Sequence, residues 1–411
     1  MRGWKKSTLG ELCKIIPGQS PKGSNYNGLG EGLPFYQGKK EFGEKCLGAP
    51  VKWTTQITCE AIAGDILMSV RAPVGPINFA TERICIGRGL AAIRVGKQIH
   101  REFLFYLLLS MQDDIKGSKG AIFSSINKEQ IESIRFSKPP LPEQKRIVAT
   151  LDKTFTAIET AITNTKKNLA NVRELFSSIL DRIFQYSEFA EGLGSYCNEG
   201  WIETTLGDLC MFRRGLTYKK GDEVPTSKNA VLRANNITVE TGEINFDEIR
   251  FISDKIEIPK SKRVSPGSLL ICTASGSKKH LGKIGLIEDN LNYAFGGFMG
   301  LLVPSDQVLP KYLFWLTRSD SYRDFINTLS DGVNINNLKW SQLSRFSVPL
   351  PPIPEQKQIV ATLDKLSAEK QSLVRIYETK ASALAELKQS ILHKAFAGEL
   401  TADRVLSDAG I

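Results

Sequence analysis

The sequence predicts an α+β fold in which two mixed, strand-rich regions are separated by an antiparallel pair of long coiled-coil helices, with pseudo-two-fold symmetry. Three observations predict it. One segment of 15 residues occurs twice almost unchanged, each copy opens a long stretch with a helical apolar period, and the stretches before the copies carry short strand signals. With 411 residues, the chain is long enough for two or three hydrophobic cores.

The repeated segment reads PPLPEQKRIVATLDK at 139–153 and PPIPEQKQIVATLDK at 351–365, identical at 13 of 15 positions. A weaker repeat opens each half, with WKKSTLGELC at 4–13 and WIETTLGDLC at 201–210, identical at six of ten. The chain is therefore two copies of one unit, each a variable region followed by the repeated segment. We expect a first globular region, a first spacer helix, a second globular region, and a second spacer helix with a tail: 1–138, 139–190, 191–350 and 351–411.

Each repeated segment is expected to begin a helix. Pro142 and Pro354 suit the first helical position, where the missing N–H costs nothing. Apolar or small residues then recur with a period close to 3.5, which is typical of a coiled-coil seam. In the first helix these residues are Ile147, Leu151, Phe155, Ile158, Ile162, Thr165, Leu169, Val172, Phe176, Ile179 and Ile183. In the second they are Ile359, Leu363, Leu366, Leu373, Tyr377, Leu384, Leu387 and Ile391, with Lys370 and Lys380 interrupting the stripe.

A helix over 143–185 would be about 65 Å long and cannot bury its apolar stripe alone. Its best partner is the second helix. The linker over 185–200 contains three glycines and is followed by a complete second region. Because the second helix returns from that region, we expect antiparallel pairing, with the two variable regions at opposite ends of the helices.

Both variable regions contain apolar runs of four to eight residues cut by Gly, Pro and Asn, which predict short strands joined by tight turns. One helix is expected in each region, near 100–113 and near 310–327. We expect the aromatic side chains of these helices to pack in the core rather than stack on bases. They align in three pairs: Phe103 with Tyr312, Phe105 with Phe314, and Tyr106 with Trp315.

The formal net charge of +10 makes a polyanion a reasonable partner. The charge is uneven, because residues 1–138 hold 20 basic and 12 acidic residues whereas 191–411 hold 27 and 26. Arg, Lys, Asn and Gln side chains in loops that flank strands can pair with base edges or hold phosphates. We expect DNA contacts from Lys22, Gln37, Lys39, Lys40, Arg71, Arg88, Lys116, Lys119, Arg213, Arg214, Lys219, Lys220, Arg233, Asn235, Asn236, Lys278, Lys279, His280 and Lys283.

No catalytic motif is assembled in the sequence. GRGLAA at 87–92 lies in a strand-like run and opens no helix, so we expect a turn rather than a nucleotide site. KPPL at 138–141 and LPPI at 350–353 lack the amide or acid and the aromatic of an amino-methyltransferase tetrad. The three histidines are scattered and no C-x-x-C pair occurs, which predicts no metal site. We therefore expect no catalysis and no cofactor.

Neither a membrane nor a secretory location is indicated. No apolar run approaches the ~20 residues that span a bilayer, and the N-terminus lacks an apolar signal region. Seven cysteines without paired spacing do not predict a disulfide framework. We expect a cytoplasmic protein.

The duplicated P-P-[LI]-P-E-Q-K start of a long helix, after each of two non-identical globular regions, resembles the specificity subunit of type I restriction–modification systems (the HsdS family). SILHKAFAGELT at 390–401 resembles the end of that family's second helix, and SILDRIFQ at 178–185 is its counterpart in the first. The resemblance covers nearly the whole chain.

The resemblance implies that each globular region is a target-recognition domain that reads one half of an asymmetric, bipartite target in double-stranded DNA. It also implies a non-catalytic subunit that docks two methyltransferase (modification) subunits, which methylate an adenine, and restriction subunits that cut DNA with ATP. Two alternatives stay open. One is a coiled-coil scaffold that binds protein partners rather than DNA, which the near-neutral second half favours, and the other is a stand-alone DNA-modifying enzyme.

Overall fold

The computed structural model describes residues 4–115, 125–184, 200–277, 280–330, 337–397 and 399. The chain divides into two units, which we call the first unit (Met1–Lys166 with Thr379–Ile411) and the second unit (Lys167–Glu378). The expected linker lies outside the described residues except for its last residue, and so do four expected DNA contacts: Lys116, Lys119, Lys278 and Lys279.

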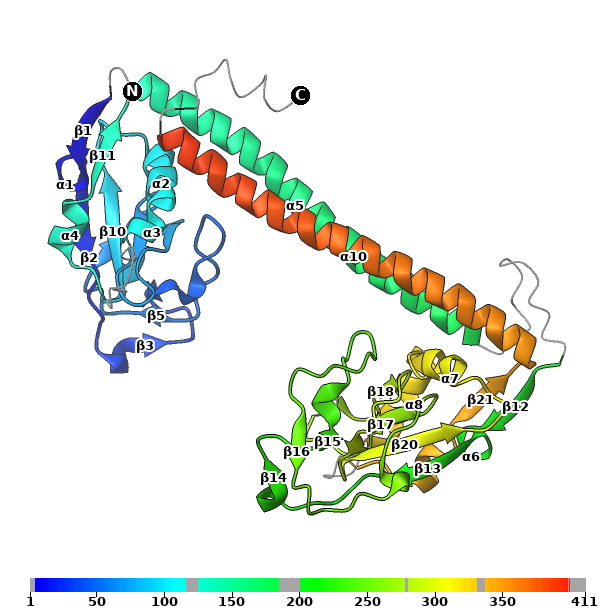
Figure 1. Cartoon of the computed structure of the whole chain (residues 1–411). Helices are drawn as coiled ribbons and strands as arrows, with labels where there is room; N and C mark the ends of the chain where they lie inside the picture. Colours follow the sequence, from blue (N-terminus) through cyan, green and yellow to red (C-terminus); the bar gives the residue numbers. More distant parts are fainter. Residues whose placement is uncertain are drawn as a thin grey trace. The chain divides into compact units, whose positions relative to one another are not determined.

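The first unit contains many short strands (Figure 1). Their bounds are β1 (Lys5–Thr8), β2 (Cys13–Pro17), β3 (Tyr26–Asn27), β4 (Leu33–Tyr36), β5 (Trp53–Thr54), β6 (Glu60–Ala61), β7 (Ile66–Ser69), β8 (Ile77–Phe79), β9 (Ile84–Ile86), β10 (Leu90–Val95) and β11 (Arg135–Lys138). They form a four-stranded antiparallel sheet of order β2-β10-β7-β8, a five-stranded sheet of order β3-β5-β4-β9-β6, and a β1-β11 pair.

Helices flank these sheets. The first unit contains α1 (Leu9–Leu12), α2 (Arg101–Ser110), α3 (Gln112–Ile115) and α4 (Lys128–Glu132). Two long helices, α5 (Leu141–Phe184) and α10 (Ile353–Phe396), contribute residues to both units. Helix α2 lies between the four-stranded sheet and the long helices, because it shares one apolar cluster with both.

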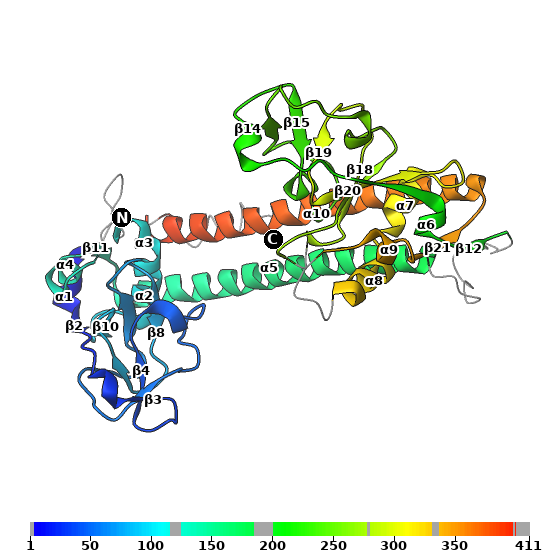
Figure 2. The ribbon, with the colours of Figure 1, turned by 90° about the horizontal axis from the view of Figure 1, so that it is seen from below.

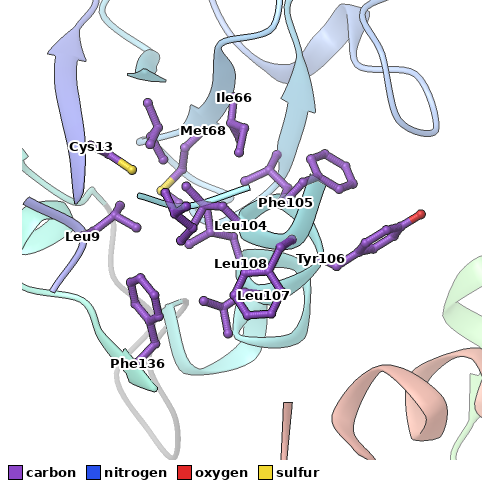
Figure 3. Close-up of a cluster of buried hydrophobic side chains, with 14 of the residues drawn as sticks. Leu9, Cys13, Ile66, Met68, Leu104, Phe105, Tyr106, Leu107, Leu108 and Phe136 are labelled. Carbon is purple, nitrogen blue, oxygen red and sulfur yellow. The ribbon is translucent and has the colours of Figure 1, made fainter. Parts of the chain in front are cut away.

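The four-stranded sheet of the first unit is buried on both faces. Ile66 and Met68 of β7 pack with α2, whereas Leu67 between them packs with the five-stranded sheet, as the alternation of side chains along a strand requires. Figure 3 shows Leu104 of α2 in the first of these clusters, while the hydroxyl of Tyr106 points away from it. Because the strands are short, each presents only one or two apolar side chains to each face of the sheet.

The second unit repeats this plan (Figure 2). Its strands are β12 (Ile202–Thr205), β13 (Cys210–Arg214), β14 (Glu223–Val224), β15 (Asn229–Leu232), β16 (Arg250–Ile252), β17 (Leu269–Cys272), β18 (Ile284–Leu286), β19 (Ala294–Phe295), β20 (Met299–Pro304) and β21 (Ser347–Leu350). Its shorter helices are α6 (Leu206–Leu209), α7 (Pro310–Leu316), α8 (Asp320–Ser330) and α9 (Trp340–Leu343).

The sheets of the second unit correspond to those of the first. The four-stranded order β13-β20-β17-β18 matches β2-β10-β7-β8, and β12 pairs with β21 as β1 pairs with β11. Leu269 and Ile271 face α7, whereas Leu270 and Cys272 face the sheet of order β14-β16-β15-β19. The predicted α+β class and the duplication of one unit are confirmed.

The long helices pack against each other within each unit. In the first unit, Leu151 and Phe155 near the start of α5 share a cluster with Leu392 near the end of α10. In the second unit, Phe176 near the end of α5 shares a cluster with Leu363 near the start of α10. The start of each helix therefore packs against the end of the other, which confirms the predicted antiparallel pairing.

The apolar stripe of α10 departs from its prediction at two positions. Leu373 is 40% exposed and Leu387 is 47% exposed, so neither is part of the buried seam. Lys370, which interrupts the stripe, places its Nζ 4.3 Å from the ring centroid of Phe176. Burial, together with the positive charges of neighbouring arginines, lowers the pKa of Lys370. The cation–π contact explains how a lysine occupies this position.

The helix expected near 310–327 is in fact two helices, α7 and α8. Between them the hydroxyl of Thr317 donates to O of Phe314 over 2.9 Å, and that of Ser319 donates to O of Leu316 over 2.6 Å. Such bonds compete with the helical backbone pattern, so the helix ends here. The first expected helix is likewise divided, into α2 and α3. All six aligned aromatic side chains are buried, as predicted.

Candidate nucleic-acid interface

In the first unit, residues 87–89 form the turn that joins β9 to β10. The C-terminal ends of β2, β4 and β7 are hydrogen-bonded to this turn or to the residue after it. Backbone hydrogen bonds fix the arrangement: from Gly18 N to Leu90 O (2.8 Å), from Gly87 N to Tyr36 O (2.8 Å) and from Val70 N to Gly89 O (3.0 Å). We call the turn and the residues that directly follow β2, β4 and β7 the first turn cluster.

The second unit has the same arrangement at residues 296–298, between β19 and β20. The corresponding bonds run from Gly215 N to Met299 O (3.0 Å), from Gly296 N to Leu232 O (2.9 Å) and from Thr273 N to Phe298 O (2.9 Å). We call this turn, with the last residues of β13 and the residues that follow β13, β15 and β17, the second turn cluster. Each bond has its counterpart in the first unit, so Phe298 occupies the position of Gly89.

Glycine is required where the chain passes closest to each turn. A Cβ atom on Gly18 would lie 2.2 Å from O of Gly87, and one on Gly215 would lie 1.9 Å from O of Gly296. No side chain fits in that space. Together with the backbone hydrogen bonds, this close approach fixes each turn against the strand that passes it.

Three predicted DNA contacts lie at the first turn cluster. Gln37 directly follows β4, Arg71 follows β7, and Arg88 is at the tip of the turn, all three exposed. Arg71 and Arg88 line one cleft of ≈ 300 Å³, together with Lys128 at the start of α4. The other predicted contacts described in this unit are exposed between β2 and β5: Lys22, Lys39 and Lys40.

Three predicted contacts lie at the second turn cluster. Arg213 and Arg214 end β13, and Arg233 directly follows β15. Lys262, which the sequence did not single out, donates from Nζ to O of Arg214 over 2.8 Å, which brings a further cation to the cluster. The remaining described contacts lie outside it, with exposed or, for the histidine, half-buried side chains: Lys219, Lys220, Asn235 and His280.

Two predicted contacts are internal, and this corrects the expectation. Asn236 is fully buried, accepts from Arg233 N over 2.9 Å and donates to O of Asn245 over 3.1 Å. Lys283 is buried and donates from Nζ to O of Ile237 over 2.7 Å. Burial lowers the pKa of Lys283. Both side chains hold loops of the second unit together and have no surface to offer to DNA.

The arginines of the turn clusters differ from others of the fold in their charge environment. Arg83 pairs with Glu60 over 2.6 Å, and Arg94 pairs with Asp65 over 2.8 Å. Among the residues that the structure describes, no carboxylate forms an ion pair with Arg71, Arg88, Arg214 or Arg233. Unpaired guanidinium groups on a rigid surface are available to phosphates and base edges.

A second residue at this interface that the sequence did not single out is Phe298. Its side chain is 74% exposed, although it lies between the buried strands β19 and β20. Charge and hydrogen-bonding capacity selected the sequence candidates, and a phenylalanine has neither. The signal that could have found it is the pair of glycines before it, which mark the turn.

Equivalent aspartates of the repeated segment tie each globular region to the long helices. The hydroxyl of Tyr106 donates to Asp152, and Nε1 of Trp315 donates to Asp364 over 3.0 Å. Burial, reinforced by Asp152, raises the pKa of Tyr106. A lysine also pairs with each aspartate. Nζ of Lys45 lies 3.2 Å from Asp152, and Nζ of Lys311 lies 3.0 Å from Asp364. Within each unit the globular region is thus tied to α5 or α10.

The described residues hold no group of three or more His, Cys, Asp and Glu side chains that could bind a metal ion. Burial raises the pKa of Cys13 to about 11 and that of Cys210 to about 12, so these thiols stay protonated near neutral pH. Within the part of the chain that the structure describes, no helix combines the length and apolar character needed to cross a membrane.

Comparison with known proteins gives one consistent result. The model of the type I restriction modification DNA specificity domain matches residues 1–171 and again 198–378. A putative type I restriction enzyme MjaX specificity subunit from Methanocaldococcus jannaschii is 39% identical over 196 residues, 44% of this chain and 45% of the relative. The EcoKI specificity subunit of Escherichia coli K12 is 32% identical over 206 residues, 49% of this chain and 44% of the relative.

The chain thus spans about half the length of these two relatives. A longer match, to the EcoBI specificity subunit of Escherichia coli, is 22% identical and covers 97% of this chain and 86% of the relative. Two solved structures share the fold. One, from work on complex assembly and conformational transition of the type I R-M system, has a TM-score of 0.78 at 20% identity, covering 97% of this chain and 99% of that one. The HsdS subunit of Thermoanaerobacter tengcongensis has a TM-score of 0.59 at 20% identity, covering 97% and 98%.

Proposed function

Because the chain belongs to the type I restriction modification DNA specificity family, we propose that it is the sequence-specific DNA-recognition subunit of a type I restriction–modification complex. It acts in the cytoplasm, needs no cofactor and carries out no catalysis of its own. The observation that carries this proposal is the pair of turn clusters, one in each unit, whose arginines form no ion pair with a described carboxylate. Those of the first cluster are exposed, and in the second Arg214 is exposed whereas Arg213 and Arg233 are half-buried.

Each globular region, residues 1–138 and 191–350, reads one half of a bipartite target in double-stranded DNA. The target is asymmetric because the two turn clusters differ, with Arg88 in the first turn and Phe298 in the second. Exposed basic side chains elsewhere in the regions, such as Lys39 and Lys219, hold phosphates and set the register. The spacer helices, within 139–190 and 351–411, set the distance between the half-sites.

The subunit also assembles the complex. Two methyltransferase (modification) subunits dock on the duplicated helical segments, since one kind of partner can bind a repeated surface twice. They flip out and methylate the target adenine, and restriction subunits join the same complex. The chain supplies the specificity and its partners supply the chemistry.

A swap of one globular region tests this proposal. Residues 14–138 are replaced by the equivalent region of a relative with a different target, and the methylated motif is read by sequencing. We expect one half-site to change and the other to stay. A change in both half-sites, or in neither, contradicts the modular reading.

The near-neutral second half of the chain favours a second candidate, a coiled-coil scaffold that binds proteins rather than DNA. The two candidates differ in the salt dependence of binding to duplex DNA. Phosphate contacts release counterions, so the affinity of a specificity subunit falls steeply as salt rises. A scaffold binds duplex DNA weakly at every salt concentration.

A further inference from the structure

We infer that Phe298 is a specificity-determining residue of the second half-site, where its ring contacts the methyl group of a thymine. This inference rests on the proposed DNA-recognition function and assigns a base contact to a residue without charge or hydrogen-bonding groups. It follows from the exposure of the ring, the rigidity of its turn, and the cations around it.

The exposure of Phe298 is unusual for its place in the fold. The residues on either side of the turn, Phe295 and Met299, are 0% and 2% exposed, whereas Phe298 is 74% exposed. An apolar ring of this size gains free energy when it leaves water, so its exposure at a rigid turn is typical of a binding surface. Single exposed apolar residues are common on protein surfaces, so exposure alone does not define a binding site.

The backbone of Phe298 is held in place by three hydrogen bonds to its carbonyl oxygen. They come from Thr273 N (2.9 Å), from Ala274 N (3.1 Å) and from the hydroxyl of Thr273 (3.0 Å). Thr273 is itself buried. The ring therefore starts from a fixed point and has only two side-chain torsions to order when it binds, so contact with a ligand costs little entropy.

Three cationic residues lie near the turn, which indicates a polyanionic partner rather than an apolar one. A Cβ atom on Gly296, two residues before Phe298, would lie 3.7 Å from Cγ of Arg233. Arg214 pairs with Gly300, two residues after it, across the β13–β20 ladder, and Lys262 binds the carbonyl of Arg214. Among the described residues none of these three cations has an ion-pair partner. Nζ of Lys262 is bound to the carbonyls of Arg214 and Gly215, so the two arginines supply the positive charge that is available to phosphates.

Comparison of the two clusters shows what differs at the contact. The first turn presents the guanidinium of Arg88 beside Gly89, and the second presents the ring of Phe298 beside Gly297. A guanidinium recognises O6 and N7 of guanine, whereas an apolar side chain recognises the methyl group of thymine. Equivalent turns of the fold thus present different chemistries at neighbouring positions, which makes the two half-sites different in sequence.

The test uses the full chain expressed with the modification subunits of its host, and compares Phe298→Ala with Phe246→Ala. Phe246 is a matched control because it is an exposed phenylalanine of the same unit, at 49%, whose ring lies against Tyr293 rather than at the turn. The methylated motif of each strain is read by sequencing. We expect Phe298→Ala to relax one A·T position of the second half-site by about tenfold in relative methylation, with the first half-site unchanged. Phe246→Ala leaves the motif as it is.

A binding measurement then tests the methyl group itself. The thymine at the relaxed position is replaced by deoxyuridine in a synthetic duplex. We expect the wild-type complex to lose about fourfold in affinity, the factor for one buried methyl group, and the Phe298→Ala complex to lose nothing.

Three results overturn the inference. The motif of Phe298→Ala is unchanged, or methylation falls equally at all sites as it would for a protein-docking residue, or the wild-type complex does not distinguish thymine from deoxyuridine. Failure of the proposed function looks different, because deletion of the whole gene then leaves every methylated motif in place.

Discussion

Oε1 of Gln356 accepts a hydrogen bond of 2.8 Å from the backbone N–H of Leu309, the residue that precedes α7. Its Nε2 donates to the carbonyls of Gln307 and Pro351, and the side chain is fully buried. Gln144 makes the equivalent bond of 2.7 Å to His100 N, ahead of α2. The glutamine of each P-E-Q repeat therefore joins the start of a long helix to the start of the helix that supports the recognition sheet.

Replacement of this glutamine destabilises the second unit. Gln356→Leu leaves a buried N–H and two buried carbonyls with fewer partners, at a cost of about 2–4 kcal/mol in the free energy of unfolding. The measurement is urea unfolding followed by circular dichroism. Lys357→Ala, at the exposed neighbour, is the control and changes little. A cost below about 0.5 kcal/mol for Gln356→Leu would show that the joint is not structural.

The contact between α5 and α8 makes stability depend on pH. Asp181 accepts from Asp320 N over 2.7 Å. Burial, together with the negative charges of Asp320 and Asp324 and partly offset by this hydrogen bond, raises the pKa of Asp181 to about 6. Since an unfolded aspartate titrates near pH ~4, the native state binds more protons between these values. The contribution of Asp181 is therefore favourable at low pH and is lost as the pH rises through about 6.

Asp181→Asn keeps the acceptor oxygen and removes the charge. After allowance for solvent screening, we expect it to raise the free energy of unfolding by about 1 kcal/mol near neutral pH and to have no effect near pH ~4. Denaturant titrations of both proteins across this range test the difference, with the exposed Asp306→Asn as control. Equal stabilisation at both pH values would contradict the titration of Asp181.

Arg88 is expected to read the first half-site. Arg88→Ala costs about 1–3 kcal/mol in binding and relaxes one G·C position of that half-site alone. Arg83→Ala is the matched control, because Arg83 is exposed in the same unit but bound to Glu60. Binding is measured with duplexes that carry single base changes. Uniform weakening across all sequences would instead assign Arg88 to a phosphate.

Insertion of one heptad into both α5 and α10, at facing positions, tests the spacer role of the helices. Seven residues lengthen a helix by about 10.5 Å, which is about three base pairs of B-DNA. We expect the gap between the half-sites to grow by that amount, or the altered rotation to abolish methylation. An unchanged gap would show that the helices do not set the spacing.

The sequence alone predicts the features that have strong local signals. The near-identical segments predict the duplication, and the 3.5-residue period predicts α5 and α10 close to their observed ends. Burial of Tyr106 and Trp315 was also foreseen, although their bonds to Asp152 and Asp364 were not. Those bonds join elements that are some 50 residues apart, and no local pattern encodes them.

The interface was predicted less completely, because it depends on how short strands meet. From the sequence alone, Arg, Lys and Asn residues in loops are all candidates. Only the register of the sheets separates Arg233, at the second turn cluster, from Asn236 three residues later, which is buried. Selection by charge also omits Phe298. The hydrogen bonds from Thr273 to its carbonyl oxygen fix the backbone at this position, and no local sequence pattern predicts them. The apolar period alone predicts a break in the seam at Lys370, whereas the contact of Lys370 with Phe176 makes it part of the seam.

Sequencing of methylated bases in host DNA, with and without this gene, tests the central claim most directly. The account predicts one asymmetric motif made of two short half-sites with an unspecified gap between them, present with the gene and lost without it. A methylome that does not change when the gene is deleted, or the loss of an undivided palindromic motif, would contradict it.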